Sequence, residues 1–278
     1  MTRIRAMSYN VRYANRNDHH DAWYARRDGV TDLVRFHAPD VVGFQEPLPD
    51  QRSDLRDRLP EYELVGRGRR VDDAGEGCPV AVRTDRWTIV DHDTFWLSET
   101  PDEPSTGWDA SHPRIATWAR VESRPATGTS QRRDRSSFVL INTHLDHRGS
   151  RAREEAARLL RRRIPELADA EREDSTHDPV VLLGDFNCIA ESTPLSVLTD
   201  GNDDRSGPRL KDAAASAELR HGPTTSITDF TELIANRRID HVLVSPAIEV
   251  AAFATLADRD DRGRYPSDHL PVLAGLDL

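Results

Sequence analysis

Apolar residues along the chain form two kinds of pattern, short continuous runs and sets at helical spacing. The run Val41-Val42-Gly43-Phe44 is typical of a strand buried within a sheet, and Gln45-Glu46 follows at its end. Similar runs recur along the whole sequence. They predict strands at 4–11, 41–44, 79–83, 87–95, 116–121, 138–143, 180–183, 239–244, 250–254 and 270–278.

Three stretches between these runs place apolar residues on one face of a helix. They lie at 23–34, at 48–59 and from Ser150 to Leu167. Strands and helices mix without strict βαβ alternation, and no repeat or long linker divides the chain. We therefore expect one α/β domain over residues 1–278 with sizeable sheets. The segment 66–77, rich in Gly, Arg and Asp, is interpreted as a mobile loop, and 123–135 as an exposed hairpin connection.

Composition excludes several classes of protein. Of the 278 residues, 37% are hydrophobic, which is enough to form a core. No apolar run reaches the ~18–20 residues of a membrane-spanning helix, and no apolar signal segment precedes the first predicted strand. Two cysteines are too few for a disulfide scaffold. We expect a cytoplasmic protein with no membrane partner and no obligate protein partner.

Charged residues are unevenly distributed among the residue types. The net charge is -10, Asp outnumbers Glu by 32 to 16, and Lys211 is the only lysine. The acidic balance argues against a generally basic nucleic-acid coat. A very salty cytoplasm favours such a surface, because carboxylates hold water and cations. A GC-rich genome also replaces Lys with Arg but does not explain the excess of acids, so halophily is our hypothesis.

Polar side chains recur where the apolar runs end. Each has a structural explanation when taken alone; Asp185 and Asn187, for example, could hold a loop through Asx hydrogen bonds. Their joint occurrence favours a functional site, because α/β proteins tend to place sites on the loops at one edge of a sheet. The set comprises Asn10, Glu46, His144, Asp185, Asn187, Asp240, Asp268 and His269.

These residue types suit hydrolysis at phosphorus. Oxygen ligands from Asp, Glu and Asn favour Mg²⁺ or Mn²⁺ over zinc. A divalent cation would neutralise a phosphoester that otherwise repels hydroxide. A carboxylate must orient and deprotonate water, and donors must hold the charge that develops on the phosphoryl oxygens. The set contains each of these parts.

Six short motifs follow one another along the chain. They are Ser8-Tyr9-Asn10-Val11, Gly43-Phe44-Gln45-Glu46, Asn142-Thr143-His144-Leu145-Asp146, Gly184-Asp185-Phe186-Asn187, Arg238-Ile239-Asp240-His241 and Ser267-Asp268-His269-Leu270-Pro271-Val272. In this order they resemble the endonuclease/exonuclease/phosphatase superfamily, also called DNase I-like. The resemblance implies a four-layer α/β sandwich, with two mostly antiparallel β-sheets packed face to face and helices on the outside.

The resemblance also implies a role for each residue of the set. Glu46 resembles the principal Mg²⁺ ligand, Asn10 supports the same metal, and Asp268 resembles an additional ligand. The remaining residues resemble the groups that act on water and phosphate. The resemblance implies that Asp185 activates water and that Asn187 and His144 donate to the phosphoryl oxygens. It also implies that His269 contacts the phosphate and that Asp240 orients and charges His269.

Further residues resemble a largely prokaryotic subgroup that carries the motif Phe95-Trp96-Leu97-Ser98-Glu99-Thr100-Pro101. Arg114 could clamp a substrate phosphate, since a guanidinium binds two oxygens at once, or form a structural salt bridge. Trp108 could stack on a base or sugar, whereas Trp96 is the better candidate for an anchor of the long loop. His147 either lines the site or is an exposed loop histidine.

The leading hypothesis is a divalent-metal-dependent phosphoester hydrolase, with Mg²⁺ (or Mn²⁺) as cofactor. The acidic surface fits a phosphorylated small molecule, while the arginines at 67–70, unless merely solvated, fit a nuclease acting on DNA or RNA. His144 stands where the repair-enzyme branch carries a tyrosine, which disfavours abasic-site cleavage. A non-catalytic binding module is the alternative of another class, and the complete motif set disfavours it.

Overall fold

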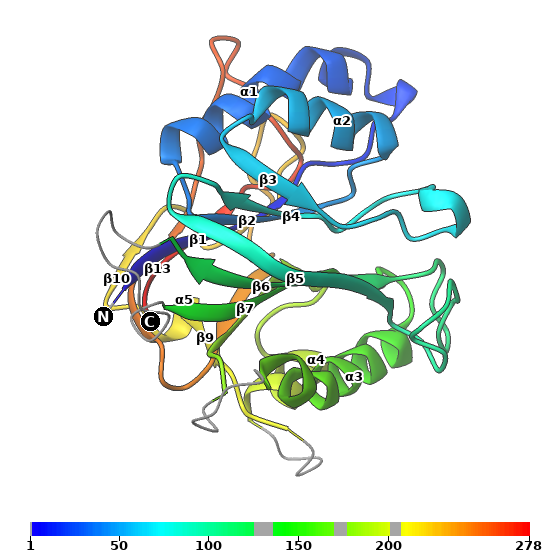
Figure 1. The fold of residues 1–278 in the computed structure, drawn as a ribbon. Helices are drawn as coiled ribbons and strands as arrows, with labels where there is room; N and C mark the ends of the chain where they lie inside the picture. The colour runs from blue at the N-terminus through cyan, green and yellow to red at the C-terminus, as the bar shows by residue number, and fades with distance from the viewer. Residues whose placement is uncertain (1, 125–135, 170–176, 201–206) are drawn as a thin grey trace.

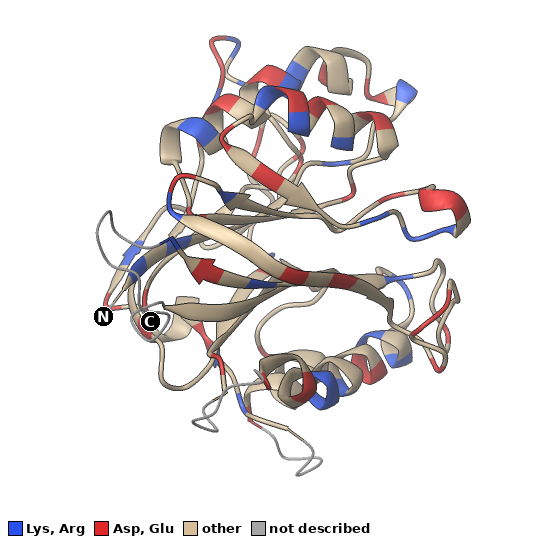
Figure 2. Ribbon diagram, in the orientation of Figure 1, with Lys and Arg blue, Asp and Glu red and all other residues tan. Residues whose placement is uncertain are grey.

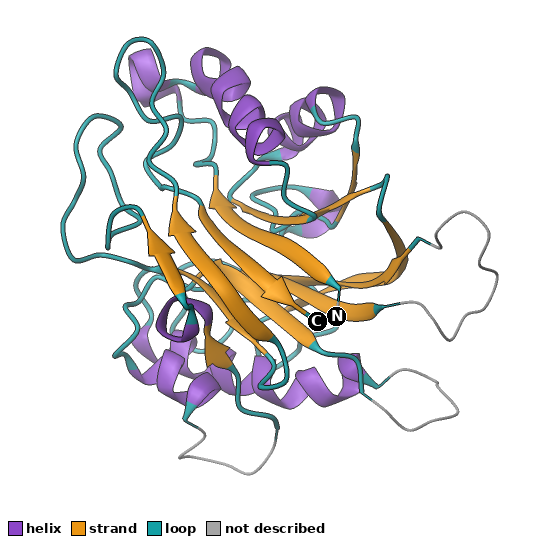
Figure 3. Ribbon diagram, turned by 90° about the vertical axis from the view of Figure 1, so that its left-hand side faces the viewer, coloured by secondary structure: helices purple, strands orange, loops and turns teal. Residues whose placement is uncertain are grey.

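The protein consists of two β-sheets packed face to face between two layers of helices (Figure 1). The computed structural model describes residues 2–124, 136–169, 177–200 and 207–278. Helices α1 (Trp23–His37) and α2 (Pro49–Arg58) cover one sheet. Helices α3 (Ser150–Ala168) and α4 (Thr193–Thr199) cover the other (Figure 3). This arrangement confirms the four-layer sandwich. None of the helices described is both long enough and apolar enough to cross a membrane.

The first sheet has seven strands in the order β10-β12-β13-β1-β2-β4-β3. They are β1 (Arg3–Asn10), β2 (Val41–Gln45), β3 (Tyr62–Val65), β4 (Val80–Arg83), β10 (Leu219–His221), β12 (Glu249–Thr255) and β13 (Val272–Asp277). The second sheet has six strands in the order β5-β6-β7-β8-β11-β9. They are β5 (Trp87–Trp96), β6 (Ile115–Ser123), β7 (Ser137–His144), β8 (Val180–Asp185), β9 (Lys211–Asp212) and β11 (Asp240–Val244). The remaining elements are the short helices η1 (Arg16–Asp21), η2 (Val71–Asp73) and α5 (Ala213–Ser216).

Every predicted strand and helix overlaps an observed one, and segment 66–77, predicted as a mobile loop, lies outside the strands of both sheets. This segment is a hairpin closed by a bridge between Gly68 and Gly77. At its tip, Asp73 accepts hydrogen bonds from the Arg52 guanidinium of α2 (2.7 Å) and from the backbone amide of Gly68 (2.5 Å). Trp96 donates from Nε1 to the carbonyl of Arg69 (2.9 Å), so it anchors this hairpin, and its anchoring of the long loop stays a prediction. Residues 125–135 of the predicted hairpin connection lie outside the described residues.

Alternation along the central strands decides which side chains face the other sheet. In β1, Ile4 and Ala6 belong to the apolar cluster between the sheets, whereas Met7 and Tyr9 pack towards α1 and α2. Asn10 has the parity of Ile4 and therefore falls on the inter-sheet face. By the same alternation, the inter-sheet faces of β2, β7, β8 and β11 carry Gln45, His144, Asp185 and Asp240.

Amide side chains connect the two sheets directly behind these strand ends. Asn142 of β7 donates from Nδ2 to the carbonyl of Phe44 (2.8 Å), and Gln45 donates from Nε2 to Asn142 Oδ1 (2.6 Å). Gly43 leaves room for this contact, since a Cβ there would lie 2.0 Å from Leu183 Cδ1 and 2.6 Å from Asn142 Cγ. The separation of the sheets is therefore fixed beside the strand ends.

Candidate active site

Strand pairing brings the predicted residues together from distant parts of the chain. Strands β1 and β2 are parallel neighbours, with Asn10 opposite Gln45, so Asn10 and Glu46 leave the first sheet at the same edge. Strands β7 and β8 form a parallel pair in the second sheet, with His144 opposite Asp185. Asp240 begins the antiparallel strand β11 opposite Asp185. The polar ends of both sheets therefore meet at one end of the inter-sheet core.

Asp185 lies at the centre of this group and is 1% exposed. Its carboxylate accepts hydrogen bonds from Asn10 Nδ2 (3.0 Å) and from the backbone amide of Asn187 (2.8 Å). Nε2 of His144 lies 3.4 Å and Nε2 of His269 lies 3.8 Å from its Oδ2. Burial raises the pKa of Asp185 to about 7, against the opposing charge of His269. A carboxyl group with this pKa can exchange a proton near neutral pH.

His269 is paired with a buried carboxylate, since its Nδ1 lies 2.9 Å from Asp240 Oδ2. Burial opposes the charged imidazolium, but the carboxylates of Asp240 and Asp185 outweigh burial and hold the pKa of His269 well above its usual range. His269 is therefore a cation at neutral pH, and its Nε2–H faces Asp185.

His144 is neutral in the same site. Burial and the positive charge of Arg114 lower its pKa well below the usual range. Asn187 Nδ2 donates to His144 Nε2 (2.9 Å) and to the carbonyl of Leu145 (2.9 Å). An uncharged imidazole that accepts at Nε2 carries its proton on Nδ1. Asn187 itself has φ 50°, so the turn after β8 directs its amide back over the strand ends.

Glu46 follows β2 with φ 73°, a conformation that costs free energy in a residue with a side chain. Asn10 Nδ2 donates to its Oε1 (3.0 Å), and the backbone amide of Tyr13 donates to its Oε2 (2.9 Å). The Asn10 amide nitrogen therefore faces both Glu46 and Asp185, while its oxygen accepts from the backbone amide of Arg12 (2.9 Å). Asn10 orients the two carboxylates relative to each other.

The donor set fits a divalent cation. One ligand atom from each of Glu46, His144 and Asp185 lies within 4.8 Å of the others, and the same holds for Asp185, Asp240 and His269. Oδ1 of Asp240 is buried and meets no hydrogen-bond partner among the described residues. Carboxylate oxygens are the ligands that Mg²⁺ and Mn²⁺ prefer. The group around Glu46 and Asp185 is therefore the candidate metal site.

Asp268, predicted as an additional metal ligand, belongs to neither of these groups among the described residues. Its carboxylate accepts from Arg12 Nη1 (2.7 Å), and the same guanidinium binds Asp18 through two hydrogen bonds of 2.8 Å each. Burial raises the pKa of Asp268, against the opposing charges of His269 and Arg12. The structure thus brings Asp268 to the rim of the site in an ion pair.

The residues predicted to bind substrate are placed differently from one another. Arg114 is buried and donates from Nε to Asp146 (3.3 Å). Its Nη2 lies 3.0 Å from Nδ1 of His147. His147 is itself exposed. Trp108 is half-buried and packs against the apolar cluster of α3, and no described contact joins it to the strand-end residues.

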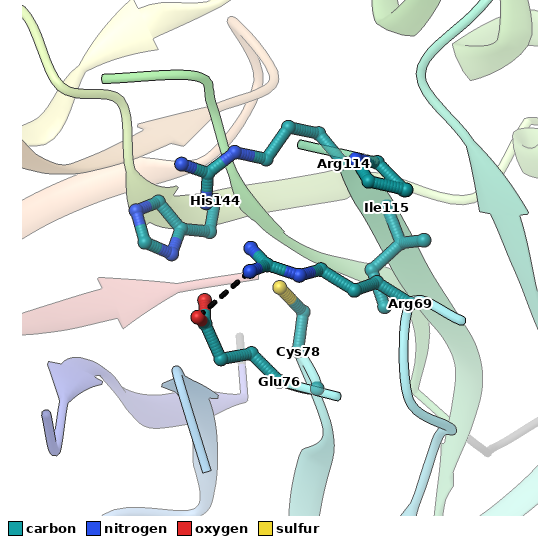
Figure 4. Close-up of a pocket in the computed structure, with 8 residues that line it drawn as sticks. Arg69, Glu76, Cys78, Arg114, Ile115 and His144 are labelled. Carbon is teal, nitrogen blue, oxygen red and sulfur yellow. Dashed lines mark hydrogen bonds and ion pairs between the residues drawn. The ribbon is translucent and has the colours of Figure 1, made fainter. Parts of the chain in front are cut away.

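A small recess lies beside His144 (Figure 4). Its polar lining includes Arg69, Glu76, Arg114 and His144, which come from the hairpin, the start of β6 and the end of β7. Arg69 donates from Nη2 to Glu76 Oε1 (2.8 Å) and is 6% exposed. The interpretation of 67–70 as merely solvated was therefore wrong for Arg69.

Several residues of the site had no predicted role. Arg12 forms an ion pair with Asp268 and directly follows the motif Ser8-Tyr9-Asn10-Val11. Asp146 lies inside a quoted motif and accepts from Arg114, from Ser111 and from two backbone amides. Arg69 and Glu76 both come from the hairpin at 66–77. The sequence signal for this hairpin was the glycines on both sides of its acidic tip.

Comparisons with known proteins agree with this geometry. The family described as the Endonuclease/Exonuclease/phosphatase family matches residues 7–269. An endonuclease/exonuclease/phosphatase family protein of Bacteroides thetaiotaomicron is 34% identical with a TM-score of 0.87, covering 100% of this chain and 96% of that chain. One from Bacteroides vulgatus is 35% identical with a TM-score of 0.86, covering 100% of both chains. A mannosyl-6-phosphatase of Bacteroides thetaiotaomicron is 32% identical with a TM-score of 0.87, covering 99% of this chain and 100% of that chain.

Proposed function

Because the chain belongs to the endonuclease/exonuclease/phosphatase family, we propose that it is a divalent-metal-dependent phosphoester hydrolase whose residues 1–278 act as one catalytic domain. The observation that carries the proposal is the convergence of Glu46, Asp185 and His269 from both sheets at one end of the core. Acidic, neutral and cationic groups stand within a few ångströms of each other there, as phosphoester hydrolysis requires.

Glu46 and Asp185 would hold Mg²⁺ or Mn²⁺. Asn10 keeps the two carboxylates in place, because its amide nitrogen donates one hydrogen bond to each of them. A cation held there would supply positive charge that offsets the negative charge of the phosphoryl oxygens. Asp268 adds negative charge at the rim, and whether it ligates a metal stays a prediction, since Arg12 holds its carboxylate in this arrangement.

Asp185 is the proposed base. Its buried carboxylate, which Asn10 and the backbone amide of Asn187 hold in place, would orient the attacking water and take its proton. The imidazolium of His269, kept charged by Asp240, donates from Nε2 to a phosphoryl oxygen. A second phosphoryl oxygen can replace His144 as an acceptor for the Asn187 amide. These donors hold the negative charge that grows while the water oxygen binds phosphorus and the ester oxygen leaves.

A phosphorylated small molecule is the better-supported substrate class. The mannosyl-6-phosphatase resembles this chain over its whole length, and the net charge of -10 disfavours a long polyanion. Arg114 is the proposed phosphate clamp and His147 its neighbour, while a stacking role for Trp108 stays a prediction. A nuclease remains the second candidate, supported by the local arginines of the hairpin.

Hydrolysis of p-nitrophenyl phosphate and bis(p-nitrophenyl) phosphate tests this function. We expect activity with Mg²⁺ or Mn²⁺, loss of activity in EDTA, and recovery when the metal is added back. Glu46→Gln should raise the metal concentration needed for half-maximal activity by about tenfold or more, because it removes one anionic ligand. Activity that is undiminished after complete chelation would overturn the metal requirement. A folded protein inactive on every phosphoester would favour the binding module.

A further inference from the structure

The recess beside His144 is a built feature of the fold (Figure 4). The guanidinium groups of Arg69 and Arg114 converge there with the carboxylate of Glu76 and the ring of His144. Arg69 and Arg114 are 6% and 5% exposed, so both cations are held in a largely desolvated environment. An arginine in such a place interacts more strongly with an anion than a surface arginine does.

The hairpin that supplies Arg69 is held on several sides. The carbonyl of Arg69 accepts from Trp96 Nε1, and its amide donates to the carbonyl of Glu76 (3.0 Å). Arg52, which is buried under the hairpin, binds both the side chain and the carbonyl of Asp73 (2.7 Å each). Arg69 and Glu76 are therefore preorganised, and little rotamer freedom is lost when a ligand binds.

The two arginines retain binding capacity. Nε of Arg69 is buried and meets no hydrogen-bond partner in the part of the chain that the structure describes. Asp146, the carboxylate that contacts Arg114, already accepts from the backbone amides of Arg148 (2.9 Å) and Gly149 (2.8 Å) and from Ser111 Oγ (2.8 Å). Its negative charge is shared among these donors, so Arg114 can still attract an anion.

We propose that Arg69 and Arg114 bind one non-ester oxygen of a terminal phosphate in this recess, whose free volume of about 10 Å³ admits one water-sized atom, and make the enzyme prefer phosphomonoesters over phosphodiesters. The proposal rests on the proposed function. A monoester has three non-ester oxygens and a charge of about -1.5 to -2 at pH 7. A diester has two such oxygens and a single charge. Because Glu76 and Asp146 offset the charges of Arg69 and Arg114, the match lies in the number of acceptors. With one oxygen at the two guanidiniums and two at the proposed donors His269 and Asn187, each non-ester oxygen of a monoester has a donor.

The test compares kcat/KM for p-nitrophenyl phosphate and for bis(p-nitrophenyl) phosphate, which share one leaving group. Arg69→Gln should lower the monoester-to-diester ratio at least tenfold. Arg69→Lys should recover part of it, because the charge is kept while the forked geometry is lost. Arg70→Gln is the matched control, since Arg70 is the exposed neighbour on the same hairpin, and it should leave the ratio unchanged. Circular dichroism confirms that the variants are folded.

Binding of inorganic phosphate, measured by calorimetry, gives a readout that needs no turnover. We expect Arg69→Gln to weaken phosphate binding at least tenfold and Arg70→Gln to leave it unchanged. A wild-type enzyme that prefers the diester, or a ratio and phosphate affinity that Arg69→Gln leaves unchanged, overturns the proposal while hydrolysis itself still stands. If the wild type cleaves neither ester, the proposed function fails, and the phosphate measurement alone decides the role of the recess.

Discussion

Two imidazoles flank the carboxylate of Asp185 with opposite protonation states. His269 is charged because Asp240 and Asp185 face it, whereas His144 is neutral because it is buried near Arg114. Neighbouring groups therefore assign different tasks to the same side-chain type within one site. In the proposed mechanism the His269 cation donates to phosphate, while the neutral ring of His144 accepts from the Asn187 amide.

Asp240→Asn tests the charged state of His269. The raised pKa of His269 lies above the unfolded value of about 6.5, so the stability that the pair contributes is complete below pH ~6.5 and is lost as pH rises through the folded pKa. The pKa of Asp185 is about 7 in the folded protein and lower in the unfolded chain. The contribution of Asp185 to the unfolding free energy therefore changes only below about pH 7 and is constant above it. We therefore expect the wild type to lose more unfolding free energy than Asp240→Asn as the pH rises above about 7.

Hydrolysis by Asp240→Asn should fall by about 10²-fold or more at neutral pH, because a neutral His269 is a weaker donor. Urea unfolding at several pH values measures the stability difference, and initial rates measure the loss of activity. Equal pH dependence in the two proteins, or full activity in the variant, would show that Asp240 does not set the charge of His269.

The site residues that sequence predicts are those at the ends of regular strands. Asn10, His144 and Asp185 could be placed because strand ends are visible as the limits of apolar runs. Arg12 and Asp146 could not be given roles, since their partners are far along the chain or depend on loop conformation. The positive φ of Arg12, which turns the chain after β1, leaves no mark in the sequence.

Among the elements, the contact between β2 and β8 sets the geometry of the site. Gly43 lies in β2, where any side chain would overlap Leu183 of β8 and Asn142 of β7. The sheets can therefore come close enough for Asn10 of one to bind Asp185 of the other.

Gly43→Ala should separate the sheets at this point. We expect a loss of ~1–3 kcal/mol in unfolding free energy from overpacking, together with at least tenfold lower activity because the two halves of the site move apart. Gly29→Ala, on helix α1, is the matched control. A Cβ at Gly29 would lie 3.5 Å from Pro266, which is an ordinary van der Waals contact. This substitution should stabilise the protein by ~0.5–1 kcal/mol and preserve activity. A Gly43→Ala protein as stable and active as the wild type would refute this account of the contact.

Long elements were predictable and short ones were not. The central strands and α3 carry clear apolar patterns, which gave their positions to within a few residues. Strand β10 (Leu219–His221) has three exposed residues and no pattern, and it forms only by pairing with β12 at the edge of the sheet. The hairpin at 66–77 has no local apolar pattern either. Hydrogen bonds from the side chains of Arg52 and Trp96 hold it in place.

For the whole molecule, acidic and basic residues are distributed along the fold (Figure 2), and the chain has an acidic excess. Both signs are interspersed on the helices, and exposed ion pairs such as Arg35–Glu61 are common. Such pairs contribute ~0–1 kcal/mol each, so screening them costs little. Repulsion within a net charge of -10 is the larger effect at low ionic strength.

Salt should therefore stabilise the folded chain. We expect the midpoint of urea unfolding to rise when KCl is increased from dilute buffer to molar concentration, since the Debye length falls from ~30 Å at 0.01 M to ~3 Å at 1 M. Unfolding in dilute buffer with rescue by molar KCl would support adaptation to salt. Full stability in dilute buffer, unchanged by KCl, would refute it and leave base composition as the explanation of the missing lysines.

Hydrolysis of p-nitrophenyl phosphate by the wild type and by Asp185→Ala, with Mg²⁺ present, tests most directly whether the protein is a metal-dependent phosphoester hydrolase that acts through Asp185. Asp185 accepts a hydrogen bond from the other sheet, is the proposed base and lies in the candidate metal site. We predict metal-dependent hydrolysis by the wild type and a rate lowered by about 10³-fold or more in the folded variant. A folded Asp185→Ala protein that hydrolyses the ester at the wild-type rate would contradict this prediction.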